Sequence, residues 1–347
     1  MNSSTRRTAN LLFIASAAAA IAAVLSISAG SAIAAKAKGV DVEIPYDGSQ
    51  LKTPSIKQPF YLQPAAGGMI VSDEAGGVYT VAMSGAAKPL ADKTKLKHPA
   101  GLAEAPAGFG AYAGQVFVLN APEGEKGPCE VDRIDKSGAV STFAKLPDVG
   151  TAKPTLCRDL EFGPAASAYA GKLFAAVSGD STIYAIDPSG KPSVFASLSK
   201  PMAFDLSAIA FATSSDPKAP GKMLVGARPR MTGASKIGRI VIVGPDGKVD
   251  SDPYLVGFID PTGFGYSPAN WGSYGNTFMI ADMGRPAASG GSSDGSVYRV
   301  YKGVARPFAS NLADPTCMKF VGHKMVLADP SAKGVGSGAI VVISSML

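Results

Sequence analysis

A short phrase recurs along the chain, and this repetition constrains the fold more than any other feature of the sequence. In each copy a Pro-Ala pair leads to a Tyr and a Gly and then to an apolar run, and the copies are centred on Tyr112, Tyr169 and Tyr274. The first two tyrosines are 57 residues apart, and the third follows after 105, close to two such periods. A period near 50 residues that contains several short β runs is typical of a propeller blade.

Each repeat divides into four candidate strands, because apolar and polar residues alternate with a period of two between turn residues. The candidate innermost strands are 59–62, 101–104, 159–162, 208–211, 263–266 and 317–320. The candidate second strands are 69–72, 116–119, 173–177, 223–226, 277–281 and 325–328. The candidate third strands are 78–82, 129–134, 182–186, 239–243, 297–301 and 339–343. The candidate fourth strands are 87–90, 140–144, 193–197, 254–258 and 305–309.

Only five candidate fourth strands accompany six sets of the other three. An alternating segment near the N-terminus, Val40–Ile44, supplies the missing strand. Closing the last blade with a strand from the other terminus removes an exposed sheet edge. The sequence therefore predicts an all-β, six-bladed β-propeller over residues 36–347, with its last blade closed by this N-terminal strand. A pair of β-sandwiches is the alternative, but it does not account for the shared phrase.

Residues 1–35 have the three parts of a secretory signal peptide. An Arg pair precedes an apolar stretch at 11–28, and the small residues at 31–35 offer a cleavage site. An uncleaved membrane anchor is the alternative, because the low-charge run is long enough to span a bilayer. We expect cleavage near residue 35, a periplasmic or secreted protein, and no membrane contact after cleavage.

Three cysteines, Cys129, Cys157 and Cys317, allow one disulfide in an oxidising compartment. Cys157 and Cys317 begin the third and sixth inner strands, and these blades face each other across the ring, which is too far for a bridge. Cys129 begins a third strand one blade before Cys157, at the same face. We therefore predict a Cys129–Cys157 disulfide and a free Cys317.

The charge balance gives no support to nucleic-acid binding. The formal net charge is +6 over 347 residues, and the Arg pair of the signal segment contributes two of those charges. The rest is mild, because nucleic-acid-binding domains concentrate Lys and Arg in strong patches. We expect a monomer without a nucleic-acid partner.

Several phrases of the chain resemble known six-bladed propellers. They are Gly114–Asn120, Asp260–Tyr266 and Ser296–Tyr301. The strand rhythm over residues 40–346 is similar to that of NHL-type repeats and of the gluconolactonase, senescence-marker and strictosidine-synthase-like superfamily. In the lactonase branch, this resemblance implies a divalent metal, often calcium, at the mouth of the channel, held in part by a Glu on the first inner strand. Here the matching segment, Gln58–Leu62, carries no Glu.

Second strands of a propeller end at one face, and polar residues occupy several of these ends. Asp73, Asn120, Asp282 and Asp329 stand at equivalent positions. Carboxylate and amide oxygens are ligands that Ca²⁺ prefers, so these residues are candidate calcium ligands. The alternative is that each is an ordinary turn residue whose side chain binds its own backbone.

Other candidates for chemistry lie near the same face. Asp159 and Glu161 alternate on the third inner strand, and His98 precedes the second one, where it is a candidate base. Arg228 and Arg285 occupy related places in adjacent blades and offer guanidinium groups to an anionic ligand. A structural His, and arginines that only keep loops solvated, are the alternatives.

Two functions are compatible with these residues. The first is a metal-dependent hydrolase of lactonase or ester type, in which the metal polarises a carbonyl and a carboxylate or His98 activates water. The second is a non-catalytic periplasmic propeller that binds a small ligand or a protein partner with this face. The missing Glu favours the second function, whereas the acidic residues at the strand ends, with Asp159 and Glu161, favour the first. Because of the resemblance to the lactonase superfamily we predict the hydrolase, with the binding propeller as the alternative.

Overall fold

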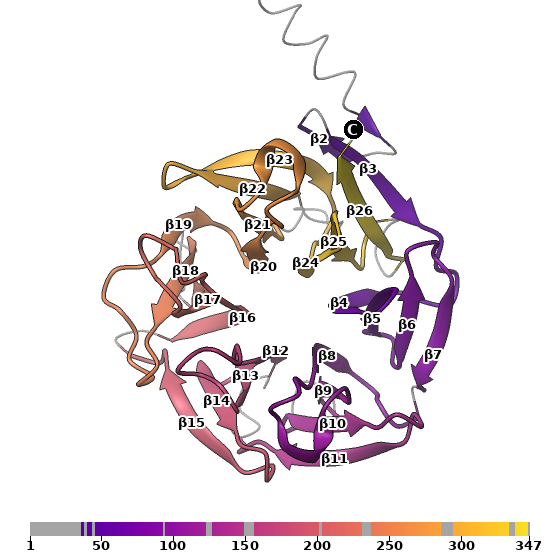
Figure 1. Ribbon diagram of the computed structural model, residues 1–347, viewed down its shortest axis with the longest axis vertical. Helices are drawn as coiled ribbons and strands as arrows, with labels where there is room; N and C mark the ends of the chain where they lie inside the picture. Colours follow the sequence, from indigo (N-terminus) through magenta and orange to yellow (C-terminus); the bar gives the residue numbers. More distant parts are fainter. Residues whose placement is uncertain are drawn as a thin grey trace, which may run out of the picture.

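Six antiparallel sheets surround a central axis in the computed structural model of the chain (Figure 1). The structure describes residues 36–37, 40–43, 46–92, 94–122, 127–148, 156–200, 203–230, 237–285, 294–332 and 337–345. The expected all-β, six-bladed propeller is confirmed. The expected signal segment, residues 1–35, lies outside the described residues.

Blades 1 to 4 each contain four strands in chain order from the channel outward, whereas blades 5 and 6 also include strands from the N-terminal region. Blade 1 consists of β4 (Pro59–Ala65), β5 (Gly68–Asp73), β6 (Val78–Ala82) and β7 (Ala87–Ala91). Blade 2 consists of β8 (Pro99–Glu104), β9 (Val116–Asn120), β10 (Glu130–Ile134) and β11 (Val140–Lys145). Blade 3 consists of β12 (Cys157–Phe162), β13 (Leu173–Val177), β14 (Thr182–Ile186) and β15 (Pro192–Ser197). Blade 4 consists of β16 (Phe204–Phe211), β17 (Met223–Pro229), β18 (Gly238–Val243) and β19 (Leu255–Phe258). Blade 5 contains β20 (Pro261–Tyr266), β21 (Phe278–Asp282), β22 (Gly295–Tyr301) and β23 (Val304–Leu312). Blade 6 has β24 (Cys317–Val321), β25 (Lys324–Asp329) and β26 (Ala339–Ser345).

A strand from the N-terminal part of the chain closes blade 6, but it is not the segment expected. The outer strand is β3 (Tyr46–Leu51), which pairs with β26. The segment named from the sequence, Val40–Ile44, was the wrong choice, because β2 (Val40–Val42) pairs with the outer strand of blade 5 instead. Polar residues and a Gly in β3 hide its strand character, since alternation is the signal for a strand.

Contacts of β2 explain why it belongs to blade 5. Val42 is buried in the apolar cluster that contains Phe308 and Leu312 of β23. The neighbouring Glu43 forms an ion pair with Arg299 of β22, with 2.9 Å between Oε2 and Nε. A further short strand, β1 (Lys36–Ala37), pairs with β2. Blade 5 therefore has six strands.

The second strand of each blade forms the centre of the core. Every residue of β5, β9, β13 and β21 is buried, and their side chains pack against the neighbouring blades. The inner strands approach so closely that two of them need glycine. A Cβ on Gly101 would lie 2.3 Å from the backbone nitrogen of Leu160, and one on Gly263 would lie 2.4 Å from that of Met318.

The repeated phrase packs blades together. Two copies form short 3-10 helices, η1 (Gly110–Tyr112) and η2 (Gly272–Tyr274), between the first and second strands. In blade 3, the buried Tyr169 hydroxyl donates a hydrogen bond to the carbonyl of Val243 in blade 4 at 2.7 Å. In blade 5, the Trp271 indole donates to the carbonyl of His323 in blade 6 at 3.0 Å. These residues tie neighbouring sheets together.

The predicted disulfide is confirmed. Cys129, just before β10, is bonded to Cys157 at the start of β12, and the two Cα atoms are 5.8 Å apart. Cys317 is free and buried, as predicted. A disulfide is compatible with an oxidising compartment. None of the described residues belongs to a helix with the length and apolar character needed to cross a membrane.

Candidate functional site

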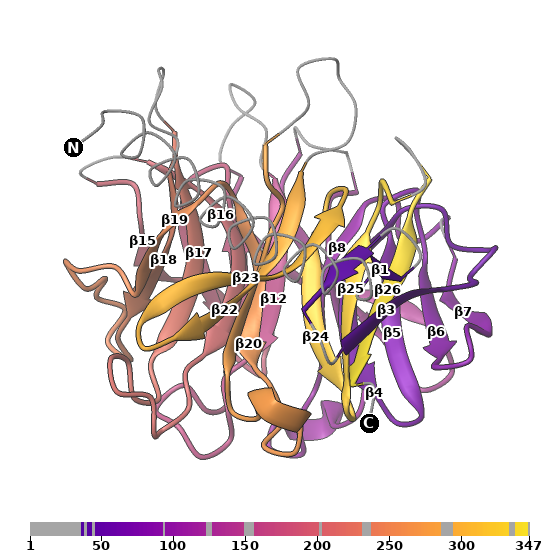
Figure 2. The same cartoon turned by 90° about the horizontal axis from the view of Figure 1, so that it is seen from above.

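The strands run along the ring axis, so their ends meet at two faces (Figure 2). We call the mouth face the one where the inner strands begin and the second strands end. Here five of the six inner strands shift register against the second strand of their blade. Such bulges are common beside active sites, because the extra residue re-aims a side chain.

The residues at these shifts form a ring around the channel, which we call the inner ring. Its members are Phe60, Ala100, Arg158, Ser207, Thr262 and, just before β24, Thr316. They line two adjoining depressions of the mouth face. Phe60 and Arg158 border both of them.

The first depression, which we call the rim hollow, lies between blades 1, 2 and 3 and has a volume of about 420 Å³. His98, Arg158 and Phe60 line it together with Gln58 and Glu74. His98 is exposed, and its backbone amide donates to the side-chain oxygen of Asn120 at 3.2 Å. The sequence thus identified one member of this hollow, His98.

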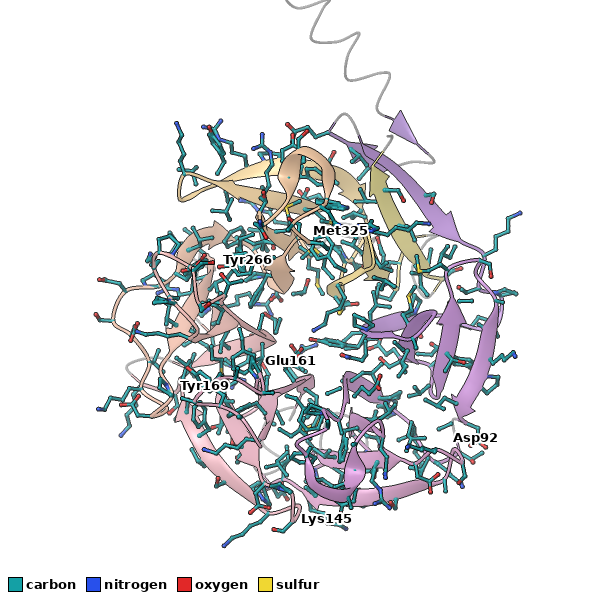
Figure 3. The ribbon with its side chains drawn as sticks, in the orientation of Figure 1. Asp92, Lys145, Glu161, Tyr169, Tyr266 and Met325 are labelled. Atoms are coloured by element: carbon teal, nitrogen blue, oxygen red, sulfur yellow. A yellow bond between two sulfur atoms is a disulfide. The ribbon has the colours of Figure 1, made fainter. Side chains whose placement is uncertain are left out.

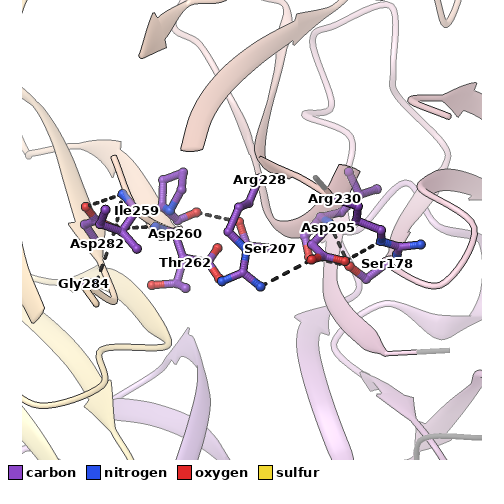
Figure 4. Close-up of polar contacts among 12 residues, drawn as sticks. Ser178, Asp205, Ser207, Arg228, Arg230, Ile259, Asp260, Thr262, Asp282 and Gly284 are labelled. Atoms are coloured by element: carbon purple, nitrogen blue, oxygen red, sulfur yellow. Dashed lines mark hydrogen bonds and ion pairs between the residues drawn. The ribbon is translucent and has the colours of Figure 1, made fainter. Parts of the chain in front are cut away.

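The second depression, the pit, has a volume of about 130 Å³ and lies toward blades 4 and 5. Asp205, Asp260 and Arg228 line it, and with the neighbouring Arg230 they form a connected set of ion pairs (Figure 4). Arg228 lies 3.3 Å from Asp205 and 3.1 Å from Asp260, and Arg230 lies 2.5 Å from Asp205. Burial raises the pKa of Asp260, and the guanidinium of Arg228 opposes that shift. The predicted ligand residue Arg228 is therefore already paired with two carboxylates.

Arg158 differs from these arginines. It is only partly buried, and its side chain forms no ion pair or hydrogen bond with another residue in the part of the chain that the structure describes. Its charge acts on Asp260 from a distance. The three arginines carry one more formal charge than the two acids, Asp205 and Asp260. Because Arg228 and Arg230 are paired with these acids, the excess positive charge belongs to Arg158.

Asp159 and Glu161 lie deeper on β12, and Glu161 points into the channel (Figure 3). The Glu161 carboxylate accepts a hydrogen bond from Lys319 of the opposite blade at 2.7 Å, so this pair crosses the channel. Asp159 is fully buried and accepts from the backbone amides of Leu160 and Ile209, at 2.6 and 2.5 Å. Burial raises the pKa of Asp159 to about 6, although Lys319 opposes the shift. Neither acid lines the rim hollow or the pit.

The four candidate calcium ligands form a second, outer ring. Three of them hold the backbone that enters the inner strand of the same blade. Each carboxylate accepts hydrogen bonds from two successive backbone amides, at 2.6 to 3.2 Å. The amides are those of Lys57 and Gln58 for Asp73, of Ile259 and Asp260 for Asp282, and of Ala313 and Asp314 for Asp329. Asn120 binds the amide of His98 and donates to Asp132 at 2.9 Å.

These contacts do not fit a shared calcium ion. The four residues belong to four different blades, and their oxygens are occupied by backbone amides or, for Asn120, by His98. Among the described residues, no group of three or more His, Cys, Asp or Glu side chains is placed to hold a metal ion. The calcium site stays a prediction, and no step below uses it.

Arg285 is the remaining candidate. Its side chain is exposed at the rim and borders neither depression, while its backbone amide donates to Asp294 at 2.5 Å. Sequence reasoning missed Arg158, Asp205 and Asp260. The sequence does mark the position of Arg158. Three polar or small residues, Cys157 to Asp159, interrupt the apolar–polar alternation at the start of an inner strand, and such an interruption can indicate a bulge.

No known sequence family matches the chain, and no curated protein matches it either. Solved structures do match. The PQQ-bound aldose sugar dehydrogenase of Streptomyces coelicolor is 16% identical, with a TM-score of 0.56, over 87% of this chain and 99% of that one. A protein provisionally named gluconolactonase is 13% identical, with a TM-score of 0.55, over 88% and 93%. Virginiamycin B lyase of Staphylococcus aureus is 12% identical, with a TM-score of 0.51, over 87% and 99%.

Identities this low establish the fold and nothing finer. The three proteins have different activities on a similar scaffold, so the residues at the mouth, and not the fold, must carry the functional argument. The chain is a six-bladed propeller whose structural neighbours include a sugar dehydrogenase, a lyase and a gluconolactonase-type protein.

Proposed function

We propose that the protein binds a small anionic ligand at the mouth face, with Arg158 as the group that receives the negative charge. The observation that carries this proposal is the unequal pairing of the arginines. Arg228 and Arg230 are neutralised by Asp205 and Asp260, whereas the Arg158 side chain has no such partner among the described residues. A guanidinium can bind a carboxylate or phosphate through two parallel hydrogen bonds.

The surroundings of Arg158 support this role. Arg158 borders the rim hollow and the pit, so a ligand in either depression can reach it. The half-buried Phe60 supplies apolar surface beside it. Partial burial strengthens a charge pair relative to one in open water, because the effective dielectric constant is lower.

Hydrolysis of an ester or lactone is the second candidate function. It is supported by His98, which is exposed and lines the same hollow as Arg158. An imidazole there can take a proton from water while Arg158 stabilises the negative oxygen that develops. A gluconolactonase-type protein and a lyase among the structural neighbours are compatible with catalysis on this scaffold. Export to the periplasm, supported by the signal-like N-terminus and the disulfide, belongs to the same proposal.

Calorimetric titration with acetate, succinate and phosphate at low ionic strength tests the binding proposal. We expect at least one of these anions to bind, and Arg158→Ala to weaken that binding by about 10- to 30-fold, the size of one charge-assisted pair. Arg306→Ala is the matched control, because Arg306 is exposed on β23 and lines neither depression. The proposal is overturned if none of the anions binds, or if Arg158→Ala binds as the wild type does.

A lactone and a simple ester, followed by proton release, test the second candidate. We expect turnover to fall at least 100-fold in His98→Ala, because general-base catalysis contributes about that much or more. Equal rates for the wild type and His98→Ala would exclude His98 as the base and leave the binding proposal intact.

A further inference from the structure

The hydroxyl groups that line the pit share an unusual property, because each already donates its hydrogen to the protein. Three of them bridge to the next inner strand around the channel. These hydrogen bonds run from Ser207 Oγ to the carbonyl of Pro261 (2.7 Å), from Thr262 Oγ1 to that of Pro315, and from Thr316 Oγ1 to that of Phe60 (2.6 Å). The hydroxyl of Tyr61, which also lines the pit, is hydrogen-bonded to Asp159.

A hydroxyl group has one hydrogen and two acceptor lone pairs. Once the hydrogen is committed, only lone pairs remain for a guest. The side of the pit formed by Tyr61, Ser207, Thr262 and Thr316 therefore offers acceptors. A guest in contact with this side must bring hydrogen-bond donors.

Asp260 adds an incompletely neutralised negative charge to the same cavity. One of its carboxylate oxygens forms an ion pair with Arg228 at 3.1 Å, and the other is buried without a hydrogen-bond partner among the described residues. Asp205 forms ion pairs with both Arg228 and Arg230, whereas Asp260 pairs only with Arg228. The positive charge of Arg228 is therefore divided between two carboxylates, and it compensates that of Asp260 only in part. A buried carboxylate oxygen without a partner is costly, and a cationic donor beside it lowers that cost.

We infer that the ligand is a small zwitterion of the amino-acid type, with its ammonium group in the pit against Asp260 and the ring of hydroxyl lone pairs, and its anionic group on Arg158. An ammonium brings three donors and one positive charge. The pit is small, with a volume of about 130 Å³, about a third of that of the rim hollow. This inference rests on the proposed function, because it adds a second group to the same ligand.

The charges at the mouth exclude two simpler guests. A bare cation meets Arg158 and Arg228, which line the pit as well. An uncharged hydroxyl satisfies the lone pairs but leaves the charge of Asp260 without compensation. A zwitterion places opposite charges on Asp260 and Arg158, and it adds no net charge to the site.

Three probes that share one carboxylate test the inference by calorimetric titration of the mature chain. Glycine has the charge and three N–H donors, betaine has the charge without donors, and acetate has neither. We expect glycine to bind at least 10-fold more tightly than acetate, with betaine between them. Asp260→Asn should reduce the preference of glycine over acetate to less than threefold, because the ammonium group loses its carboxylate partner.

The outcomes separate this inference from the proposed function. If acetate binds and glycine binds no better, the zwitterion is excluded and the anion site at Arg158 stands. If neither binds, both proposals fail. A preference for glycine that survives unchanged in a folded Asp260→Asn variant removes Asp260 from the site and overturns the inference. If that variant does not fold, the glycine, betaine and acetate series on the wild type decides alone.

Discussion

Two rings of residues occupy the same end of this propeller, and they use their polar groups in opposite ways. The outer ring, at the ends of the second strands, places its oxygens on amides of its own blade, as Asp329 does with Ala313 and Asp314. The inner ring, at the register shifts of the inner strands, faces the channel mouth and includes Arg158, whose side chain has no ion-pair partner among the described residues. Charge that is already compensated maintains the fold, whereas charge that is left over is available to a ligand.

Asp159 is the most severe test of this contrast, because it lies on an inner strand but holds backbone amides as the outer ring does. Its pKa is raised to about 6 by burial, from about 3.9 in an unfolded chain. The folded state therefore binds this proton more tightly. Its contribution to stability is complete below about pH 4 and is lost as the pH rises through 6, a change of about 3 kcal/mol.

Urea unfolding from pH 4 to pH 7.5 measures this change. We expect the wild type to lose stability relative to Asp159→Asn over that interval. The comparison concerns the slope against pH, since the amide also weakens one backbone contact and shifts the whole curve. Parallel curves for the two proteins would show that Asp159 does not titrate there.

Removal of an outer-ring carboxylate is expected to reduce stability and leave ligand binding unchanged. Asp329→Ala should lower the free energy of unfolding by about 2 kcal/mol, because the amides of Ala313 and Asp314 lose a charged acceptor. Asp329→Asn, which keeps one acceptor oxygen, should recover part of that loss. A thermal melt gives the stability, and titration with acetate gives the binding. Weaker acetate binding in a folded Asp329→Ala variant would contradict the separation of the two rings.

The smallest expected effect concerns a hydroxyl of the inner ring. Thr262→Val should cost about 1 kcal/mol of stability, because the carbonyl of Pro315 loses its hydrogen bond. It should also weaken glycine binding two- to fivefold and leave acetate unaffected, since the pit loses the acceptor lone pairs of this hydroxyl. Thr80→Val is the matched control, because Thr80 is exposed on β6 and its hydrogen bond, at 3.4 Å, is long.

Much of the fold could be predicted because it is repeated. Period-two alternation located the inner strands and the outer strands of the first five blades, and counting them showed that a strand from the N-terminal region was needed. The identity of that strand could not be predicted by alternation. β3 has the polar sequence Tyr-Asp-Gly-Ser-Gln-Leu, and its place is fixed by pairing with β26, a contact that local pattern does not contain.

The candidate site was predicted less well, for a physical reason. Residues at the strand ends, such as Asp282, are visible in the sequence because they follow an apolar run. Their contacts show that such positions bind backbone amides. Arg158 faces the mouth because of a shift in register between Cys157 and Asp159, and a register shift depends on the partner strand. The pairing of Arg228 with Asp205 and Asp260 likewise joins two blades.

The closure of blade 6 by β3 has a consequence for the order in which the chain can fold. β3 is made early, and its partner β26 is made roughly 300 residues later, which takes about 15 to 60 s at a synthesis rate of 5–20 residues per second. During this interval blades 1 to 5 can assemble in sequence, while β3 has no strand to pair with. The final pairing joins segments very distant in the chain, and contacts of this kind slow folding. Closure of the ring is therefore expected to follow the assembly of blades 1 to 5, and it can occur only after β26 has been made.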